Sequence, residues 1–271
     1  MTASTSSLGA TQRPAKPRRS PWTIIAIGAF LVITWWAASE EFGIGFDVVR
    51  VVNNLTRGAS ILAEFFPPNW SYLPQTYGPM LETFKMAVIA SIIGCGVALP
   101  VSFLASRVTT PNLAIFLADR GILNVIRALP DLLYALVFVS AVGVGPLPGI
   151  MALVLFNIGV VAKLLSETVD GVDPGPIEAT DAAGGNRTQM VRWAVLPQVL
   201  PNYVAYSLYV FELNIRASAV LGIVGAGGIG NNINTVRRFF QYDNMSVILI
   251  EIFVFVFIIE LISIWLRRRL V

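Results

Sequence analysis

The sequence predicts an all-α protein that crosses a membrane several times. Of its 271 residues, 55% are hydrophobic and 13% are charged, which is about half the charged share of a soluble domain. Residues 22–39, 86–106 and 132–162 contain no charged side chain. A helix needs roughly 20 apolar residues to cross a bilayer core, so these stretches indicate a polytopic helical membrane protein.

About six transmembrane helices are expected along the chain. The apolar stretch 132–162 is too long for one span, and the glycines and prolines of residues 143–149 divide it. A retained first span is favoured over a cleaved signal peptide, because no small-x-small cleavage site precedes Glu40 and Glu41. The expected spans cover about 22–40, 82–105, 122–142, 149–165, 202–224 and 245–266.

Basic residues at both ends of the chain predict the orientation of these spans. Four lysines and arginines precede residue 20, and residues 267–269 are all arginine. Since basic flanks mark the cytoplasmic side, both termini are expected in the cytoplasm, which an even number of spans allows. The loop 166–201 then lies inside, and residues 40–79 and 225–244 lie outside. Outer arginines at 50, 57, 237 and 238 go against the rule.

The chain is expected to divide into three parts. Residues 1–21, rich in Ser, Thr, Pro and Ala, form a disordered basic tail. Residues 22–80 supply the first span and an extracytoplasmic segment. Residues 81–271 form the core, which includes the cytoplasmic loop 166–201.

The residue inventory excludes several classes of function. Cys95 is the only cysteine, so no internal disulfide can form, and the absence of histidine excludes His-based catalysis and His metal sites. The basic residues lie in tails and loops rather than in one stripe, which argues against nucleic-acid binding. No nucleophile–base pair, metal cluster or Walker motif is present, so neither catalytic residues nor metal ligands are predicted.

The polar loop at 166–201 is longer than a simple turn requires. Residues 178–197 read EATDAAGGNRTQMVRWAVLP. Asp173 can cap a first short helix over residues 177–183, and two glycines stop it. Asn186, with Gln189 three residues later, can cap a second helix. The sequence therefore predicts a helix–turn–helix with exposed polar side chains, which is typical of a docking surface.

The spacing in this loop resembles the EAA signature of membrane subunits of ATP-binding-cassette (ABC) importers. Glu178 and Ala179 are followed by Gly184 six residues after the glutamate, and by Leu196 and Pro197. The resemblance implies a type I ABC importer permease fold, in which a short loop helix inserts into a groove of the ATPase. The alternative is an ordinary amphipathic loop helix. The residues assigned to ATPase coupling by this resemblance are Glu178, Ala179, Asp181, Gly184, Gly185, Arg187 and Pro197.

Residues between about 80 and 265 are similar to phosphonate-type permeases. The matching segments are 81–87, 127–131, 143–149, 197–201 and 214–230. Phe156 stands where many of these relatives carry histidine, so a different specificity is expected if that position contacts substrate.

The resemblance implies import of phosphonate, phosphate or a related phosphorus oxyanion by alternating access across the bacterial cytoplasmic membrane. The implied partners are two ATPase subunits, an extracytoplasmic substrate-binding protein, membrane lipid and a second copy of this chain. ATP and Mg would belong to the ATPase, and no cofactor is expected on this chain.

Two alternatives stay open. The same architecture imports methionine, glycine betaine or a sulfonate in other systems. An autonomous channel or ion-coupled carrier would transport without an ATPase, but it leaves the EAA spacing unexplained.

Charged residues within the expected spans occur in pairs four residues apart. Arg127 with Asp131, Glu212 with Arg216, and Lys163 with Glu167 would each share one helix face. Each pair either neutralises itself between helices or, for the arginines, lines a path and attracts an anion. Glu260 is expected to meet Arg267, whereas Glu251 lacks a local partner. The predicted path residues are Arg127, Asp131, Glu212, Arg216 and Ser218.

Residues 225–230 read GAGGIG and match the glycine pattern of dinucleotide-binding folds. That fold needs a preceding strand and a βαβ unit, whereas here an expected span precedes the glycines. A tight outer gate is therefore favoured over a nucleotide site, and a plain flexible loop is the alternative. The predicted gate residues are Gly225, Gly227, Gly228, Gly230 and Asn231.

Overall fold

The computed structural model describes residues 21–39, 45 and 47–270, and every regular element in these ranges is helical. This confirms the all-α prediction. The chain forms two compact units, Met1–Ser60 and Ile61–Val271. The predicted disordered tail, residues 1–21, falls almost wholly outside the described residues.

The first unit contains α1 (Pro21–Ala38) and the start of α2 (Val48–Ala63). The 18 residues of α1 include no charged side chain, which makes it long and apolar enough to cross a membrane. In contrast, α2 is amphipathic, with apolar residues recurring at helical spacing beside Arg50 and Arg57. The carboxylate of Asp47 accepts hydrogen bonds from the backbone N–H groups of Val49 and Arg50, and so caps α2.

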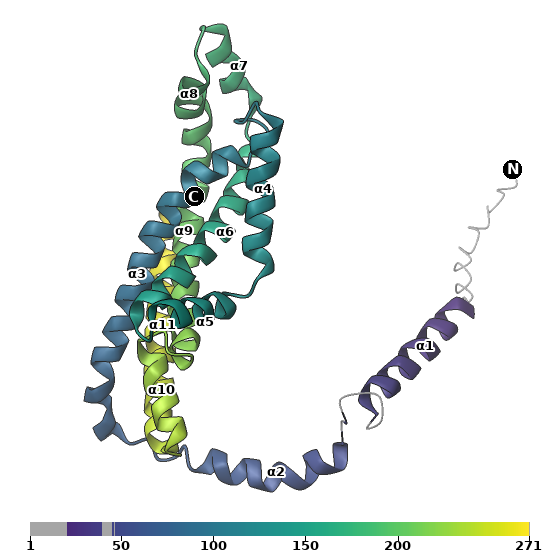
Figure 1. Cartoon of the computed structure of the whole chain (residues 1–271), viewed down its shortest axis with the longest axis vertical. Helices are drawn as coiled ribbons and strands as arrows, with labels where there is room; N and C mark the ends of the chain where they lie inside the picture. The colour runs from purple at the N-terminus through teal and green to yellow at the C-terminus, as the bar shows by residue number, and fades with distance from the viewer. Residues whose placement is uncertain (1–20, 40–44, 46, 271) are drawn as a thin grey trace, which may run out of the picture. The chain divides into compact units, whose positions relative to one another are not determined.

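The second unit is a helical bundle with a projecting polar loop (Figure 1). A short 3-10 turn, Trp70–Tyr72, leads into the first long helix. The α-helices are α3 (Leu73–Leu104), α4 (Leu113–Ala128), α5 (Asp131–Val142), α6 (Pro146–Asp170), α7 (Pro174–Ala182), α8 (Arg187–Met190), α9 (Leu196–Ile223), α10 (Ile229–Arg238) and α11 (Tyr242–Leu270).

Small residues hold the centre of this bundle together. Helices α3, α6 and α9 pack against one another, and α3 turns Ala87, Ala90, Gly94 and Ala98 inward. A Cβ atom at Gly94 would lie 2.5 Å from the Cβ of Asn157 on α6, so only glycine permits this approach. Small residues at helix contacts are the usual means by which membrane helices approach closely.

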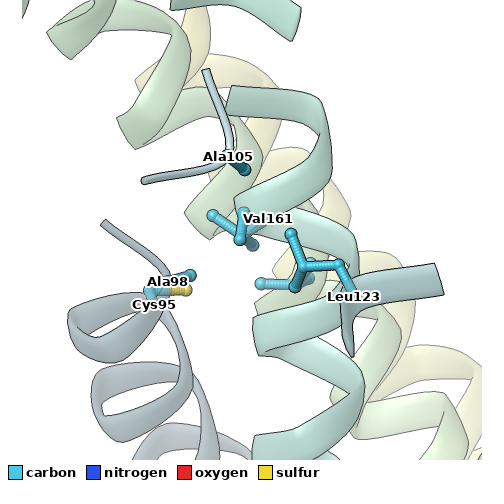
Figure 2. Packing of buried hydrophobic residues seen from close by; sticks show 7 residues of the cluster. Cys95, Ala98, Ala105, Leu123 and Val161 are labelled. Atoms are coloured by element: carbon cyan, nitrogen blue, oxygen red, sulfur yellow. The ribbon is translucent and has the colours of Figure 1, made fainter. Parts of the chain in front are cut away.

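A buried apolar cluster fixes α4 beside α3 and α6. Figure 2 shows Cys95 and Ala98 of α3 together with Leu123 of α4 and Val161 of α6. Ala105, just beyond the end of α3, belongs to the same cluster. The start of the α3–α4 connection is therefore part of the core.

By length and composition alone, fewer helices qualify as spans than the six expected from the sequence. Among the described residues, four helical segments are long and apolar enough to cross a membrane: Pro21–Ala38, Trp70–Leu104, Pro146–Asp170 and Tyr242–Arg269. A fifth is obtained if α4 and α5 are taken as one span, although they meet at 87°. Pro130, which has no N–H to donate and restricts the residue before it, stands at this break. The 28-residue α9 is long enough to span, but its polar side chains make it less apolar.

Candidate coupling surface and transport path

The loop between α6 and α9 contains the two predicted short helices. The first, α7, begins at Pro174 rather than at Ile177, and the Asp173 side chain accepts a hydrogen bond from the N–H of Gly175 at 3.0 Å. After α7 ends, Gly184 adopts a φ of +76°, a conformation that glycine reaches without a steric penalty. The predicted cap and the predicted stop are both confirmed.

The second loop helix continues directly into the bundle. Asn186 and Gln189 form the predicted capping box, with hydrogen bonds of 2.9 and 2.8 Å. A widened π-helical turn, Val191–Val195, joins α8 to α9, and Pro197 lies in the first turn of α9. Such wide turns occur frequently at functional sites. The backbone from residue 187 onward is thus one helical run that links the loop to the core.

Most of the predicted coupling residues are exposed. Glu178, Ala179, Asp181 and Gly184 lie on the surface of the loop. Gly185 is partly buried, because its Cα packs close to Thr180, where a Cβ would lie 2.7 Å from the side chain. These residues present a short, capped helix to solvent.

Arg187 differs from the other predicted coupling residues because its guanidinium is bound within the chain. Its Nε donates to the carbonyl oxygen of Thr109 at 2.7 Å, and its Nη2 donates to the carbonyl of Val108 at 3.0 Å. Arg187 is exposed, as predicted, but its guanidinium also donates to backbone carbonyls of the same chain. Arg187 ties the coupling loop to the segment that joins α3 and α4.

The sequence reasoning missed Asp170, at the end of α6. Its carboxylate accepts hydrogen bonds from the Ser106 hydroxyl at 2.6 Å and the N–H of Arg107 at 2.8 Å, and it pairs with Arg120 at 2.7 Å. No basic residue lies within four positions of Asp170 in the sequence. An acid at the end of a span without a local partner was the available signal.

Arg127 and Asp131 do not form the predicted pair on one helix. Arg127 lies in the last turn of α4, and Asp131 begins α5 beyond the bend. Asp131 instead accepts a hydrogen bond from the N–H of Leu132. Within the described residues, the Arg127 guanidinium forms neither an ion pair nor a hydrogen bond. The prediction of self-neutralisation fails here because the proline break ends the helix between the two residues.

A pocket of about 260 Å³ lies at this bend. Arg127, Asp131, Tyr134 and Phe156 are among its lining residues, so Phe156 borders the same space as the unpaired guanidinium. The Tyr134 hydroxyl donates to the carbonyl of Ile126 at 2.9 Å and so satisfies a free carbonyl near the end of α4.

Glu212 and Arg216 form the predicted ion pair, but within a larger cluster. Glu212 is 8% exposed and also meets Arg267 of α11 at 3.4 Å. Arg216, 48% exposed at its side chain, lies 3.8 Å from Glu260. The predicted pairing of Glu260 with Arg267 is therefore corrected, because the two residues take different partners on α9. The Lys163–Glu167 pair is confirmed at 2.9 Å.

Ser218, the last predicted path residue, is fully buried. Its hydroxyl donates to the carbonyl of Asn214 at 2.6 Å, and the Asn214 amide in turn donates to the Ser91 hydroxyl at 2.8 Å. Ser218 therefore bonds within α9 and is buried, rather than lying on an open surface.

The glycine segment, residues 225–230, is folded tightly against α3. Three of its glycines have positive φ angles, between +68° and +94°. The N–H of Gly228 donates to Glu82 at 3.2 Å, and the N–H of Ile229 donates to Thr83 at 2.8 Å. Gly225 accepts a hydrogen bond from Gly145 at 2.9 Å. These bonds and the burial of residues 226–230 favour a built segment over a flexible loop, and no strand precedes it in the described chain.

The coupling helices and the glycine segment lie far apart within the second unit. Figure 1 shows α7 and α8 at one end of the bundle and α10, which begins directly after the glycines, at the other. Asn231 is exposed at the start of α10.

Comparisons with known proteins agree with this arrangement. A family model described as "Binding-protein-dependent transport system inner membrane component" matches residues 98–271. A phosphite transport system permease protein of Stutzerimonas stutzeri is 36% identical over 245 residues, which cover 90% of this chain and 87% of the relative. A phosphate-import permease protein of Mycolicibacterium smegmatis is 41% identical over 212 residues, which cover 78% of this chain and 40% of that protein.

A solved structure shows the same fold. An inward-facing methionine ABC transporter matches with a TM-score of 0.67 at 22% identity, covering 75% of this chain and 99% of the other. The family match and the relatives together confirm the resemblance inferred from the EAA spacing. The chain therefore belongs to the binding-protein-dependent transport system inner membrane components, as a multi-pass permease with the type I ABC importer fold.

Proposed function

We propose that this chain is the transmembrane subunit of an ATP-driven importer of a small phosphorus oxyanion such as phosphite, phosphate or a phosphonate. One observation carries the coupling to ATP: α7 is an exposed helix capped at Asp173 and stopped at Gly184, and it is joined to the helical bundle at both ends. A helix that is capped and connected in this way can be displaced by a partner protein without unfolding.

The surface of α7 suits a groove on an ATPase subunit. Glu178 and Asp181 offer two carboxylates on an exposed helix, while Ala179 and Gly184 allow close approach. One such loop per chain matches one groove per ATPase, so two copies of this permease would serve an ATPase dimer. A binding protein would deliver cargo at the opposite end, where Asn231 is exposed. Counting α9 with the five apolar spans gives six, an even number that would place both termini on one side, which the basic flanks assign to the cytoplasm.

The names of the relatives support the class of cargo. A phosphite transport permease and a phosphate-import permease are 36% and 41% identical to this chain. A third relative, described as a putative phosphite permease, is 34% identical over 93% of this chain. These identities exceed those of relatives named for methionine at 28% and carnitine at 30%.

Arg127 is the proposed cargo contact in the bundle. Its guanidinium has no protein partner among the described residues and lines a pocket of about 260 Å³, which has room for a small oxyanion. A planar guanidinium can donate two parallel hydrogen bonds to two oxygens of one phosphorus centre. Asp131 in the same pocket limits how tightly an anion is held, as a path that must release its cargo requires. Arg216, half exposed beside Glu212 and Glu260, is a second proposed path residue.

Transport would follow alternating access. ATP-driven closure of the ATPase subunits would move α7, the bundle would open outward, and the glycine segment would form part of the outer gate. Its tight backbone packing against Glu82 and Thr83 suits a segment that seals rather than one that stays open.

The test is ATP hydrolysis by the reconstituted complex of permease, ATPase and binding protein, with phosphite, phosphate, methylphosphonate, methionine and glycine betaine as cargo. We expect stimulation by at least one phosphorus oxyanion and its loss in Glu178→Arg. Stimulation by methionine or glycine betaine alone would overturn the cargo assignment and keep the coupling. Uptake without any ATPase would overturn the coupling.

Arg127→Ala and Arg127→Lys separate cargo contact from assembly. Removing the guanidinium should lower oxyanion uptake about tenfold or more, because a charge-assisted contact contributes roughly 1.5–3 kcal/mol. The lysine variant should retain part of the activity. Both variants should co-purify normally with the ATPase. Unchanged uptake by Arg127→Ala would remove Arg127 from the path.

A further inference from the structure

The connection between α3 and α4, residues 105–112, is held from both sides of the coupling loop. One contact comes from the residue that ends α6, just before the loop, and the other from the residue that begins α8, just after α7. These contacts join segments that are 63 to 79 positions apart in the sequence. Nothing in the covalent chain requires them, since the coupling loop is connected directly only to α6 and α9.

Asp170 and Arg187 together clamp the connection at residues 105–112. The first side of this clamp is Asp170. Its Oδ1 accepts from the Ser106 hydroxyl at 2.6 Å and from the N–H of Arg107 at 2.8 Å. Its Oδ2 accepts from Arg120 Nη2 at 2.7 Å. Arg120 also donates through Nε to the carbonyl of Ala105 at 2.9 Å. One carboxylate thus joins the end of α6, the start of the connection and the side of α4.

The second side of the clamp is Arg187. Its two donors reach the adjacent carbonyls of Val108 and Thr109 at 3.0 and 2.7 Å. These carbonyls lie in a connection between helices, so no helical hydrogen bond would otherwise satisfy them. The fork of a guanidinium fits two neighbouring acceptors, whereas a lysine ammonium is a point donor.

Apolar packing and a paired amide support the same region. Val108 of the connection and Ile177 of α7 pack on one buried cluster formed by Leu165, Val169, Val195 and Val199. The Gln198 amide pairs with the backbone of Asp173 through contacts of 3.0 and 3.3 Å, which holds the start of α7 to the start of α9. Connection, loop and both flanking helices therefore form one packed block.

The connection leads directly to the pocket that contains Arg127. It enters α4 at Leu113, where the Asn112 side chain caps the helix by accepting from Ala114. Helix α4 then runs 16 residues, roughly 24 Å at 1.5 Å per residue, and carries Arg127 in its last turn. A displacement of the connection would therefore be carried along a rigid rod to the pocket.

We propose that Arg187 and Asp170 are positioning residues that transmit movement of the coupling helix α7 to α4, and through it to the pocket at the α4–α5 bend. This inference rests on the proposed function of α7 as the surface that an ATPase moves. It assigns a mechanical task to two residues that lie outside α7 and do not line the pocket.

The experiment uses the full permease–ATPase complex in liposomes with its binding protein, and phosphite, phosphate and methylphosphonate as cargo. Two quantities are measured in wild type, Arg187→Ala, Arg187→Lys and Asp170→Ala. The first is the number of cargo molecules taken up per ATP hydrolysed. The second is the change in backbone hydrogen exchange of residues 105–112 when ATP is added.

A matched control is Arg192→Ala. Arg192 is an exposed arginine of the same loop region, and its guanidinium lies over the Trp193 ring at 5.2 Å rather than on the connection. This substitution removes an arginine side chain five positions from Arg187 and leaves the hydrogen bonds to the connection in place. We expect it to match wild type in both measurements.

In Arg187→Ala we expect uptake per ATP to fall about fivefold or more, the lower end of usual coupling factors between sites. ATP hydrolysis per assembled complex should persist. Asp170→Ala should behave alike, and Arg187→Lys should recover part of the ratio. The exchange change at residues 105–112 should shrink in the alanine variants. A merely structural role would instead lower assembly and leave the ratio intact.

Two results overturn the inference. One is an unchanged ratio of uptake to hydrolysis in Arg187→Ala, and the other is an unchanged exchange response of the connection. If wild type takes up none of the three oxyanions, the proposed cargo fails. The hydrogen-exchange measurement then still tests whether Arg187 and Asp170 transmit movement to the connection, because it requires only that ATP moves the ATPase.

Discussion

The two ends of the second unit are built in opposite ways. At the coupling end, side chains provide the order: Asp173 and Asn186 cap the short helices, and Arg187 and Asp170 reach across to a neighbouring connection. At the glycine end, backbone approaches closely because glycines lack side chains, and two of its N–H groups donate to side chains of α3. The coupling end is exposed, whereas residues 226–230 are buried.

This difference predicts how strongly substitutions at each end affect the structure. A surface held by long polar side chains can shift by small amounts, because each hydrogen bond is made with solvent nearby and costs little to remake. A segment in which backbone atoms meet has no such slack, since protein interiors are closely packed. Substitutions should therefore be severe at the glycine end and graded at the coupling end.

The largest effect is expected for Gly230→Ala. A Cβ at this position would lie 2.1 Å from the carbonyl oxygen of Ala219 and 2.7 Å from the Cα of Gly222, and backbone cannot rotate away. We expect a loss of about 3 kcal/mol or more, seen as little or no folded protein after detergent extraction. The control is Gly121→Ala on α4, where a Cβ meets nothing within 4 Å. A normally folded Gly230→Ala would contradict the rigid-segment description.

A smaller loss is expected for Thr83→Val. The hydroxyl of Thr83 accepts from the buried N–H of Ile229 at 2.8 Å, and valine would leave that donor unpaired. Such a loss costs about 1–3 kcal/mol and should lower the thermal midpoint of unfolding. Thr83→Ser retains the hydroxyl and should recover most of it. Equal stability of the valine and serine variants would show that this hydrogen bond does not hold the segment.

At the coupling end, Gly184→Ala tests backbone conformation alone. Its φ of +76° is unfavourable for alanine, but no atom lies within 4 Å of the new Cβ. The expected cost is about 1–2 kcal/mol, measured by thermal unfolding. Gly171→Ala, at a negative φ of −103° and with only ordinary contacts, is the matched control and should change little. A larger loss at Gly171 than at Gly184 would reverse the account.

The smallest effect is expected for Asn186→Ala. This change removes the side-chain acceptor of the capping box and should cost about 1 kcal/mol of local stability. Faster hydrogen exchange confined to residues 186–190 would reveal it, with global unfolding barely altered. Gln189→Ala removes the reciprocal bond and should produce a similar local change. Exchange that rises throughout α9 instead would show that the cap stabilises the whole helical run.

The sequence allowed accurate prediction where the interactions are local. The Asp173 cap, the glycine stop and the Asn186 capping box each depend on residues a few positions apart, and each was found as predicted. The Glu212–Arg216 and Lys163–Glu167 pairs succeeded for the same reason. The predictions failed where one residue breaks the helix, as Pro130 does between Arg127 and Asp131.

Contacts between distant segments could not be predicted from one sequence. Neither the reach of Arg187 to Thr109 nor that of Asp170 to Ser106 leaves a periodic signal, because the partners are 78 and 64 positions apart. Glu260 pairs with Arg216, and Arg267 pairs with Glu212, instead of with each other. These ion pairs likewise depend on how α9 and α11 pack. The glycine pattern at 225–230 indicated close backbone approach, but not that α3 would supply the acceptors.

The central claim is that the two ends have different partners, an ATPase at α7 and the binding protein near α10. It is tested most directly by single cysteines at Ala179 on α7 and at Asn231 on α10, both exposed, in the assembled complex. The native Cys95 is buried and stays unreactive. A short thiol crosslinker should join the ATPase subunit to the Ala179→Cys permease and not to the Asn231→Cys permease. Crosslinking of the ATPase through Asn231→Cys, or its absence at Ala179→Cys, would contradict the account.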